Sequence, residues 1–401
     1  TYYVRHNDNP GGSVEMRLAV AAGSVHESGP TGVAHFVEHM LFNGTERFPR
    51  NELTATLRGF GAEFGADINA YTSYDETVYQ LTMPTADPSV VSTGLDVLQQ
   101  WLSAATIDPD QVVAERGVVL DEWRSSAQSV NGRVFDEIQR FFLDGSPYED
   151  RKPIGTDDEI SATTDGPLRA FYDDWYRPDN AAVLVVGDIY VDDMERKIVD
   201  RFESASARGT SPERVDLIVE PAGDARALVF DDPDVSEGFA FVTLPLARDL
   251  SGSREAVVQR DIYQELAFDI IGTRLANDAL RGEAPFDAAS VDGSGFVRSL
   301  DAPEIFVSAD GADLEASTQA VLDEYERVRR FGFTRPEFDR AVAARRSAAQ
   351  IDYDGRDSRQ DASYADEYVR HVLEGESLPT ADRWFEYVTE VLDRATPETL
   401  T

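Results

Sequence analysis

Cysteine is absent from the 401-residue sequence, which excludes disulfide bonds and thiolate metal sites. A metal ion in this protein would therefore be held by histidine and carboxylate side chains. Lysine is nearly absent too, occurring only at Lys152 and Lys197, and 75 acidic against 37 basic residues leave a net charge of −38. Such a surface repels nucleic acid and anionic membranes and favours cationic peptides at low salt. A GC-rich source or a salty habitat would explain the same charge at least as well.

Long apolar runs are missing as well. No stretch approaches the ~20 residues of a membrane-spanning helix, and no signal peptide stands at the N-terminus. The chain opens in a strand-like stretch, Thr1–Arg5, so we expect a trimmed parent chain, and the missing export signal says little about its compartment. The composition, 42% hydrophobic and 10% aromatic, allows a large core, and the length suggests two domains of ordinary size.

One stretch combines an apolar helix with polar residues that such a helix rarely carries. From about Thr31 to Asn43 the sequence is expected to form a helix, with Thr31 as its N-cap and Gly44 placed to end it. Most of its side chains are apolar, so the helix should be buried nearly all round. Two histidines and a glutamate in a buried helix would be costly without a partner, and a metal ion supplies one.

The spacing of these polar residues predicts a zinc site. His35 and His39 are four residues apart, so both rings lie on one helix face, where they can hold one ion. Glu38 lies beside them, and its carboxylate can reach a water on that metal. A lone histidine on an apolar helix is usually a hydrogen-bonded core residue. Two of only five histidines at this spacing, with the glutamate in the inverted zincin position, are unlikely to arise by chance.

A catalytic zinc site needs a third protein ligand, and Glu115 and Glu122 are the candidates. They are seven residues apart on one expected helix, close to the apolar stripe of Val112 and Val119, which indicates an inward role. Two turns of helix separate them by about 10.5 Å, so both cannot hold one ion without distorting the helix. One is expected to bind the metal and the other to hydrogen-bond a ligand histidine. Alternatively, both are surface glutamates.

The order of the expected elements indicates an α+β fold with two related domains, each an antiparallel sheet packed against long helices. The first domain spans 1–205, a segment rich in Ser, Ala, Gly and Pro over 206–224 is expected to be the linker, and the second domain spans 225–401. The second domain has no pair of histidines and cannot carry the same site. Its expected strands are 227–230, 238–244, 288–297 and 304–309, and its expected helices are 254–281, 314–331, 335–351, 359–373 and 380–395.

Several stretches resemble the pitrilysin/insulinase family of metallopeptidases, peptidase family M16, which includes the mitochondrial processing peptidase. They are His35–Thr45, Asn69–Tyr79, Glu115–Glu122 and Phe171–Asp188. The resemblance covers most of residues 1–200 and rests on element order over 225–401. Residues 61–84 are most similar to bacterial zinc proteases of the PqqL type, whose chains are longer. The resemblance therefore implies the N-terminal half of a longer chain and favours a periplasmic or secreted setting.

The resemblance implies a zinc-dependent endopeptidase with one Zn²⁺ per chain, held by His35, His39 and Glu122, and with Glu38 as the general base. The family's third ligand is the later glutamate of its Glu-Arg…Glu stretch, which is Glu122 here. The family's usual count of intervening residues would instead fall on or beside Glu115. We follow the local motif, so that Glu115 is expected to hydrogen-bond a ligand histidine.

The resemblance also implies a substrate strand. Asn69, Ala70, Tyr71 and Thr72 match the family's edge strand, to which an extended peptide or a small protein adds by main-chain hydrogen bonds. Because such pairing reads main-chain shape, side-chain preference should be broad. For Tyr71, ordinary strand packing is an equal alternative, since aromatic residues are common in strands.

One departure from the family concerns the number of halves. Family enzymes close a second, related half over the zinc half, and this chain holds one half. The second half would come from the C-terminal part of the same chain, a partner subunit or a homodimer mate. The alternatives are a non-catalytic family member that binds peptides or acts as a scaffold, and a structural zinc protein. No phosphate-binding loop supports a nucleotide or sugar enzyme, since Gly11-Gly12 lacks the spacing.

Overall fold

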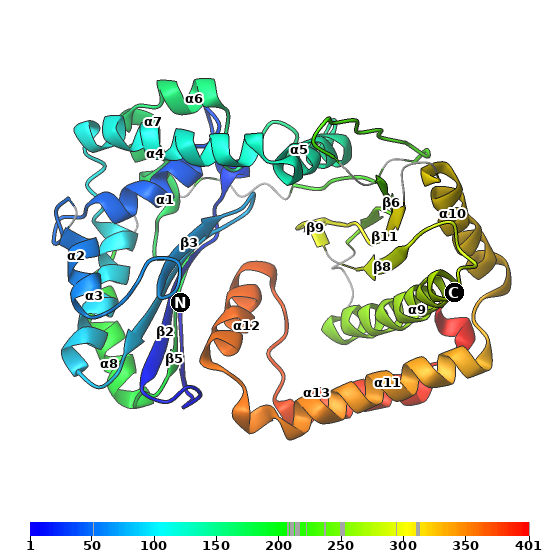
Figure 1. Ribbon diagram of the computed structural model, residues 1–401. Helices are drawn as coiled ribbons and strands as arrows, with labels where there is room; N and C mark the ends of the chain where they lie inside the picture. Colours follow the sequence, from blue (N-terminus) through cyan, green and yellow to red (C-terminus); the bar gives the residue numbers. More distant parts are fainter. Residues whose placement is uncertain are drawn as a thin grey trace. The chain divides into compact units, whose positions relative to one another are not determined.

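The structure is a computed structural model that describes the chain except residues 51, 207, 209–211, 213–216, 222, 236–237, 249–252, 294, 310–312 and 401. The chain forms two α+β units, drawn in Figure 1. The first unit contains residues 1–216 and 358–378, and the second contains 217–357 and 379–401. The chain first passes from one to the other inside the expected linker, part of which lies outside the described residues.

A five-stranded sheet forms the centre of the first unit, in the order β1-β5-β2-β4-β3. All neighbours are antiparallel except β1 and β5, which run parallel. The middle strand β2 is buried from Val14 to Val20, which explains its apolar sequence, and β3 lies at one edge. The strands are β1 (Tyr2–His6), β2 (Ser13–Val20), β3 (Ile68–Thr72), β4 (Thr77–Pro84) and β5 (Ala181–Gly187).

Helices cover both faces of this sheet (Figure 1). Met16 and Leu18 of β2 point into a large core shared with α1 and α3, and Trp101 of α3 donates a hydrogen bond to the carbonyl oxygen of Leu41 in α1 at 3.0 Å. Ala19, on the alternate face, packs against α12. The helices are η1 (Ser24–His26), α1 (Val33–Asn43), α2 (Glu52–Gly59), α3 (Pro88–Ser103), α4 (Pro109–Gln128), α5 (Val130–Leu143), α6 (Asp157–Ala162), α7 (Asp165–Trp175), α8 (Val191–Phe202) and α12 (Asp361–Glu374).

The position of α12 corrects the expected extent of the second domain. Residues 225–401 are not one block, because α12 lies on β2 and β5 of the first unit. Val369 and Leu373 of α12 pack there with Leu184, and buried Arg17 of β2 lies 3.6 Å from Asp366 of α12. Helical periodicity predicts α12 itself, but it does not say which sheet the apolar face of a helix covers.

The second unit has a three-stranded antiparallel sheet in the order β6-β11-β8, with α9 and α10 packed against it around Ile270, Ile305 and Val321. Helices α11 and α13 pack with each other and with α9. A smaller sheet has the order β7-β10-β9. The elements are β6 (Gly238–Thr243), β7 (Leu246–Ala247), α9 (Arg254–Leu280), β8 (Ala288–Asp292), β9 (Gly295–Val297), β10 (Leu300–Asp301), β11 (Glu304–Ala309), α10 (Leu314–Phe331), α11 (Arg335–Asp354), α13 (Ala381–Arg394) and η3 (Pro397–Leu400), with η2 (Arg356–Ser358) leading to α12.

Two strand predictions in this unit were wrong. Residues 227–230 form no strand, and the single strand expected over 288–297 is two strands, β8 and β9, that belong to different sheets. Short apolar runs do not reveal whether a strand partner exists, which explains both errors. Among the described residues, no helix combines the length and apolar character that crossing a membrane requires.

Candidate metal centre

The N-terminus of α1 is held by residues outside the helix. The predicted cap at Thr31 was wrong: the helix begins at Val33, and both the amide and the hydroxyl of Thr31 donate to Glu159. The cap position is Gly32, whose φ of 80° suits glycine. The amide of Ala34 instead donates to Oε1 of buried Glu27 at 2.8 Å. A carboxyl oxygen brought from an earlier turn thus does the work of an N-cap side chain.

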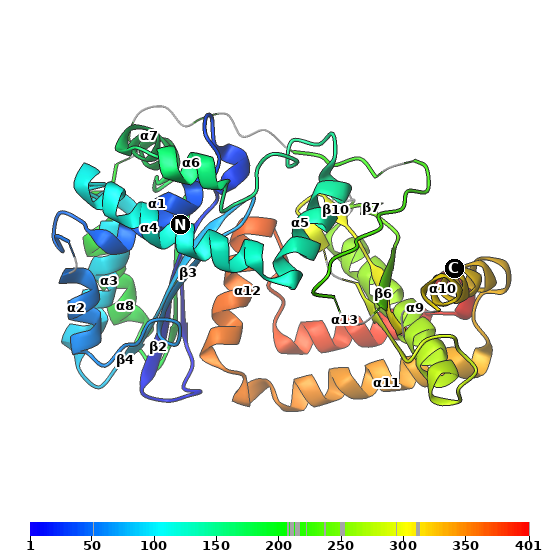
Figure 2. The same cartoon turned by 45° about the horizontal axis from the view of Figure 1, so that its top comes forward.

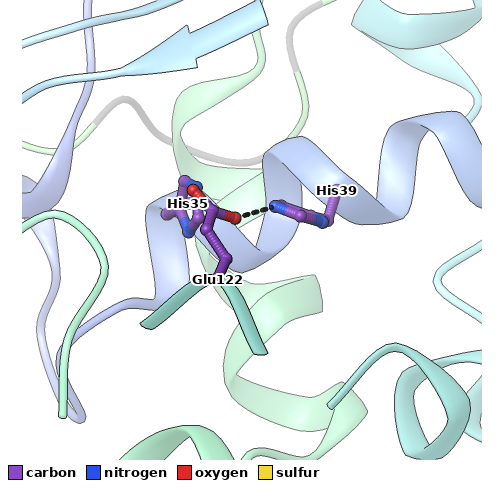
Figure 3. Close-up of side chains that lie close together, drawn as sticks. All are labelled: His35, His39 and Glu122. Carbon is purple, nitrogen blue, oxygen red and sulfur yellow. Dashed lines mark hydrogen bonds and ion pairs between the residues drawn. The ribbon is translucent and has the colours of Figure 1, made fainter. Parts of the chain in front are cut away.

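The histidine pair and Glu122 converge (Figure 3). Helix α4 packs against α1, as Figure 2 shows, and carries Glu122 towards both rings. Oε1 of Glu122 lies 3.5 Å from Nε2 of His35, and Oε2 lies 3.2 Å from Nε2 of His39. One ligand atom from each residue lies within 4.8 Å of the others.

The dimensions of this group suit a zinc ion. Nitrogen and oxygen ligands bind zinc at about 2.0–2.2 Å, so two ligands of a tetrahedral site lie about 3.4 Å apart. Oε2 of Glu122 lies at about that separation from Nε2 of His39 (3.2 Å), and Oε1 lies at about that separation from Nε2 of His35 (3.5 Å). Two imidazoles and one carboxylate also match the ligand set of catalytic zinc sites, which keep a fourth position for water or substrate.

Glu115 lies on the other side of His39. Its Oε1 is 2.9 Å from Nδ1 of His39, and its Oε2 accepts a hydrogen bond from Nδ2 of Asn43 at 2.6 Å. A carboxylate only accepts hydrogen bonds, so Nδ1 of His39 carries a proton and the lone pair for a metal is on Nε2. Glu115 and Glu122 thus contact opposite nitrogens of one ring, as the seven-residue spacing on α4 allows.

Carboxylates dominate the electrostatics of this group. Burial alone would lower the pKa of His39, but the hydrogen bonds to Glu115 and Glu122, helped by the charge of Glu38, raise it to about 9. Contact with His35 and His39 lowers the pKa of Glu122. For Glu115, burial acts to raise the pKa, and the hydrogen bonds from His39 and Asn43 outweigh it and lower the pKa. A site this rich in negative charge attracts a divalent cation.

Glu38 lies next to the metal group and is only 7% exposed. The Thr72 hydroxyl of β3 donates a hydrogen bond to its Oε2 at 2.6 Å. The remaining predicted residues of β3 divide between two faces: Asn69 and Tyr71 are exposed, whereas Ala70 is half-buried and packs against the core. The hydroxyl of Tyr71 donates to Glu76 at 2.9 Å.

Sequence reasoning missed three of these contacts. Asn43 lies four residues after His39, so the helical spacing that paired the histidines could have indicated it. Strand alternation could have placed Thr72 and Tyr71 on opposite faces of the sheet, since Thr72 shares a face with Ile68. No sequence pattern could have predicted the contact of Glu27 with α1, because that contact depends on the path of the loop between them.

Comparison with known proteins places the chain in a family. The model for Insulinase (Peptidase family M16) matches residues 2–150, and the model for Peptidase M16 inactive domain matches residues 165–345. The probable zinc protease PqqL of Escherichia coli is 39% identical over 215 residues, which are 53% of this chain and 23% of that protein. A zinc protease PQQL-like of Arabidopsis thaliana is 29% identical over 383 residues, 94% of this chain and 36% of that protein.

Among solved structures, the first half of the periplasmic protease PqqL from Escherichia coli superposes with a TM-score of 0.91 at 26% identity, covering 100% of this chain and 85% of that one. This likeness extends over both units, in agreement with the expected two-domain α+β fold. The chain spans less than half the length of the two curated relatives. On these matches the chain belongs to peptidase family M16, the pitrilysin/insulinase family.

Proposed function

We propose that this chain carries the zinc site of an endopeptidase. The observation that supports it is the convergence of His35, His39 and Glu122, with Glu38 beside them on the same helix turn. The relatives named zinc proteases support the same chemistry. One zinc ion would be held by these three ligands and, when bound, would polarise the scissile carbonyl and acidify a water.

In this proposal one residue transfers protons and another orients a metal ligand. Glu38 accepts the proton of the attacking water and gives it to the nitrogen of the leaving amine. Glu115 holds the ring of His39 with its Nε2 towards Glu122. Because Glu38 is nearly buried, its carboxylate meets little competing solvent.

The proposed substrate is a peptide or small protein bound in extended form along β3. This strand is an edge of its sheet, so its outer main-chain groups can pair with an added strand. Asn69, Ala70, Tyr71 and Thr72 would supply that main-chain edge, and the bond between Thr72 and Glu38 brings the edge next to the metal group.

A second candidate is a peptide-binding or scaffold half that needs a partner half for activity. The chain spans 23% and 36% of the two curated relatives, and one solved structure, which it covers to 85%, is described as the first half of a protease. The missing half would be the C-terminal part of the same chain, a partner subunit or a second copy.

The test is metal analysis with a peptide digest, on this chain and on a full-length version. We expect one zinc per chain, cleavage that a chelator stops without unfolding the protein, and recovery when zinc is restored. Glu38→Gln should keep zinc and lose at least ~10²-fold in rate, the low end for a positioned base.

The possible outcomes separate the candidates. Zinc binding with cleavage only in the full-length version favours the half that needs a partner. Unfolding on chelation would indicate an ion that only joins helices. Equal cleavage by the parent and Glu38→Gln would remove Glu38 from the mechanism.

A further inference from the structure

The hydrogen bond between Thr72 and Glu38 joins two elements with different proposed tasks. Glu38 belongs to α1, which also carries the histidine pair, and Thr72 is the last residue of β3. The distance of 2.6 Å from Oγ1 of Thr72 to Oε2 of Glu38 is short for a hydroxyl donor, as expected when the acceptor is a carboxylate. The Thr72 hydroxyl is the donor and the Glu38 carboxyl oxygen is the acceptor.

Strand geometry fixes the direction of the Thr72 side chain. Thr72 pairs with Thr77 of β4, and their hydroxyl oxygens lie 3.5 Å apart. Thr77 is fully buried and donates its hydroxyl to the carbonyl oxygen of Ala22 at 2.9 Å. Because β-branched side chains have few rotamers, Thr72 is held on the face that α1 covers and cannot turn to the face of Tyr71 without moving the strand.

This contact matters because a carboxylate has two oxygens and a base needs one of them aimed at the water. We propose that Thr72 is a positioning residue for Glu38, fixing Oε2 so that Oε1 takes the proton. The inference rests on the proposed function. It gives the edge strand a second role, orienting Glu38, besides pairing with the substrate peptide. A peptide that pairs with β3 and the base that cleaves it are then held by the same strand.

The test compares three variants with the parent. Thr72→Val removes the hydroxyl and keeps the branched, strand-favouring shape, and Thr72→Ser keeps the hydroxyl. The matched control is Thr82→Val in β4, because the Thr82 hydroxyl donates to the carboxylate of Glu15 at 2.7 Å in the same sheet. It deletes the same kind of bond away from the metal group.

In the peptide digest we expect Thr72→Val to lower kcat by about 10- to 100-fold, the usual range for outer hydrogen bonds in metal sites, with KM and zinc content unchanged. The kcat of Thr72→Ser should lie within about threefold of the parent value, and the kcat of Thr82→Val should equal the parent value. Equal kcat for Thr72→Val and the parent, or equal losses in the Val and Ser variants of Thr72, would overturn the proposal.

Two readouts need no turnover. Acetohydroxamate binds zinc and gives a proton to a neighbouring base, so its affinity for the zinc-loaded protein reports on that base. Its Kd should rise about tenfold in Thr72→Val, as for the loss of other outer hydrogen bonds in metal sites. Its Kd should not change in Thr82→Val. Crystal structures of the metal-free variants should show the Glu38 carboxylate displaced only in Thr72→Val. If neither this chain nor the full-length version cleaves the peptide, the proposed function fails. An unchanged Kd and an unmoved Glu38 would separately overturn the role of Thr72.

Discussion

At the scale of single residues, the candidate site is a set of carboxylates arranged around two imidazoles. Helical spacing predicts that His35 and His39 share a face and that Glu115 and Glu122 cannot occupy the same place. The residues alone left open which glutamate faces the metal position, because the answer depends on how α4 lies against α1. In the structure Glu122 contacts the Nε2 atoms and Glu115 contacts Nδ1 of His39.

Zinc affinity should depend on pH through His39. Its pKa of about 9 in the metal-free protein means that the ring is protonated at pH 7, and zinc must displace that proton from Nε2. Affinity should therefore rise about tenfold per pH unit up to pH ~9 and level off above it. Calorimetry in buffers of different ionisation enthalpy measures the released proton.

Glu115→Gln is the control for this pH dependence. It removes one of the charges that raise the pKa of His39, so the proton release should move to lower pH. Proton release that does not change between pH 7 and 10 in the parent would contradict the assignment of His39 as a ligand.

At the scale of elements, the start of α1 depends on Glu27 rather than on a cap next to the helix. Glu27→Ala removes the acceptor of the Ala34 amide and should lower the free energy of unfolding by about 1 kcal/mol, as for loss of an N-cap side chain. Glu27→Gln keeps a carbonyl oxygen at that place and should lose less. Urea unfolding of the two variants and the parent measures the difference, and equal stabilities for all three would contradict the capping role.

The same glutamate should make stability depend on pH. Burial, only partly offset by the Ala34 amide and Arg151, raises the pKa of Glu27 to about 8 from an ordinary value of 4.5. The protonated form is therefore favoured by folding, so its contribution is complete below pH 4.5 and is lost as the pH rises through 8. The stability of the parent relative to Glu27→Gln should fall between pH 5 and pH 8 in urea titrations. A constant difference would contradict a buried, neutral Glu27.

Helix α12 illustrates what sequence periodicity leaves open. Its apolar stripe predicts a buried face, yet the sheet that it covers belongs to the first unit and is distant in sequence. Leu373 is only 3% exposed in that contact. Leu373→Ala should therefore lower the free energy of unfolding by about 2–5 kcal/mol. Leu280→Ala is the control, because Leu280 is 86% exposed and should change stability by less than about 0.5 kcal/mol. Equal effects in thermal unfolding would contradict the placement of α12.

At the scale of the whole molecule, the chain joins one unit with the metal group to a second unit without any histidine. Composition, element order and motif spacing predicted the α+β class and the two-domain organisation. The strand error at 227–230 and the misplaced α12 arose where tertiary contacts, rather than local pattern, decide the outcome. The net charge of −38 is a property of the whole chain, and a charge of this sign repels polyanions.

The most direct measurement is anomalous diffraction at the zinc edge from crystals of the zinc-loaded protein. We expect one strong peak per chain, about 2.0–2.2 Å from Nε2 of His35, Nε2 of His39 and a carboxylate oxygen of Glu122. A peak elsewhere, or zinc bound at this place without Glu122, would contradict this expectation.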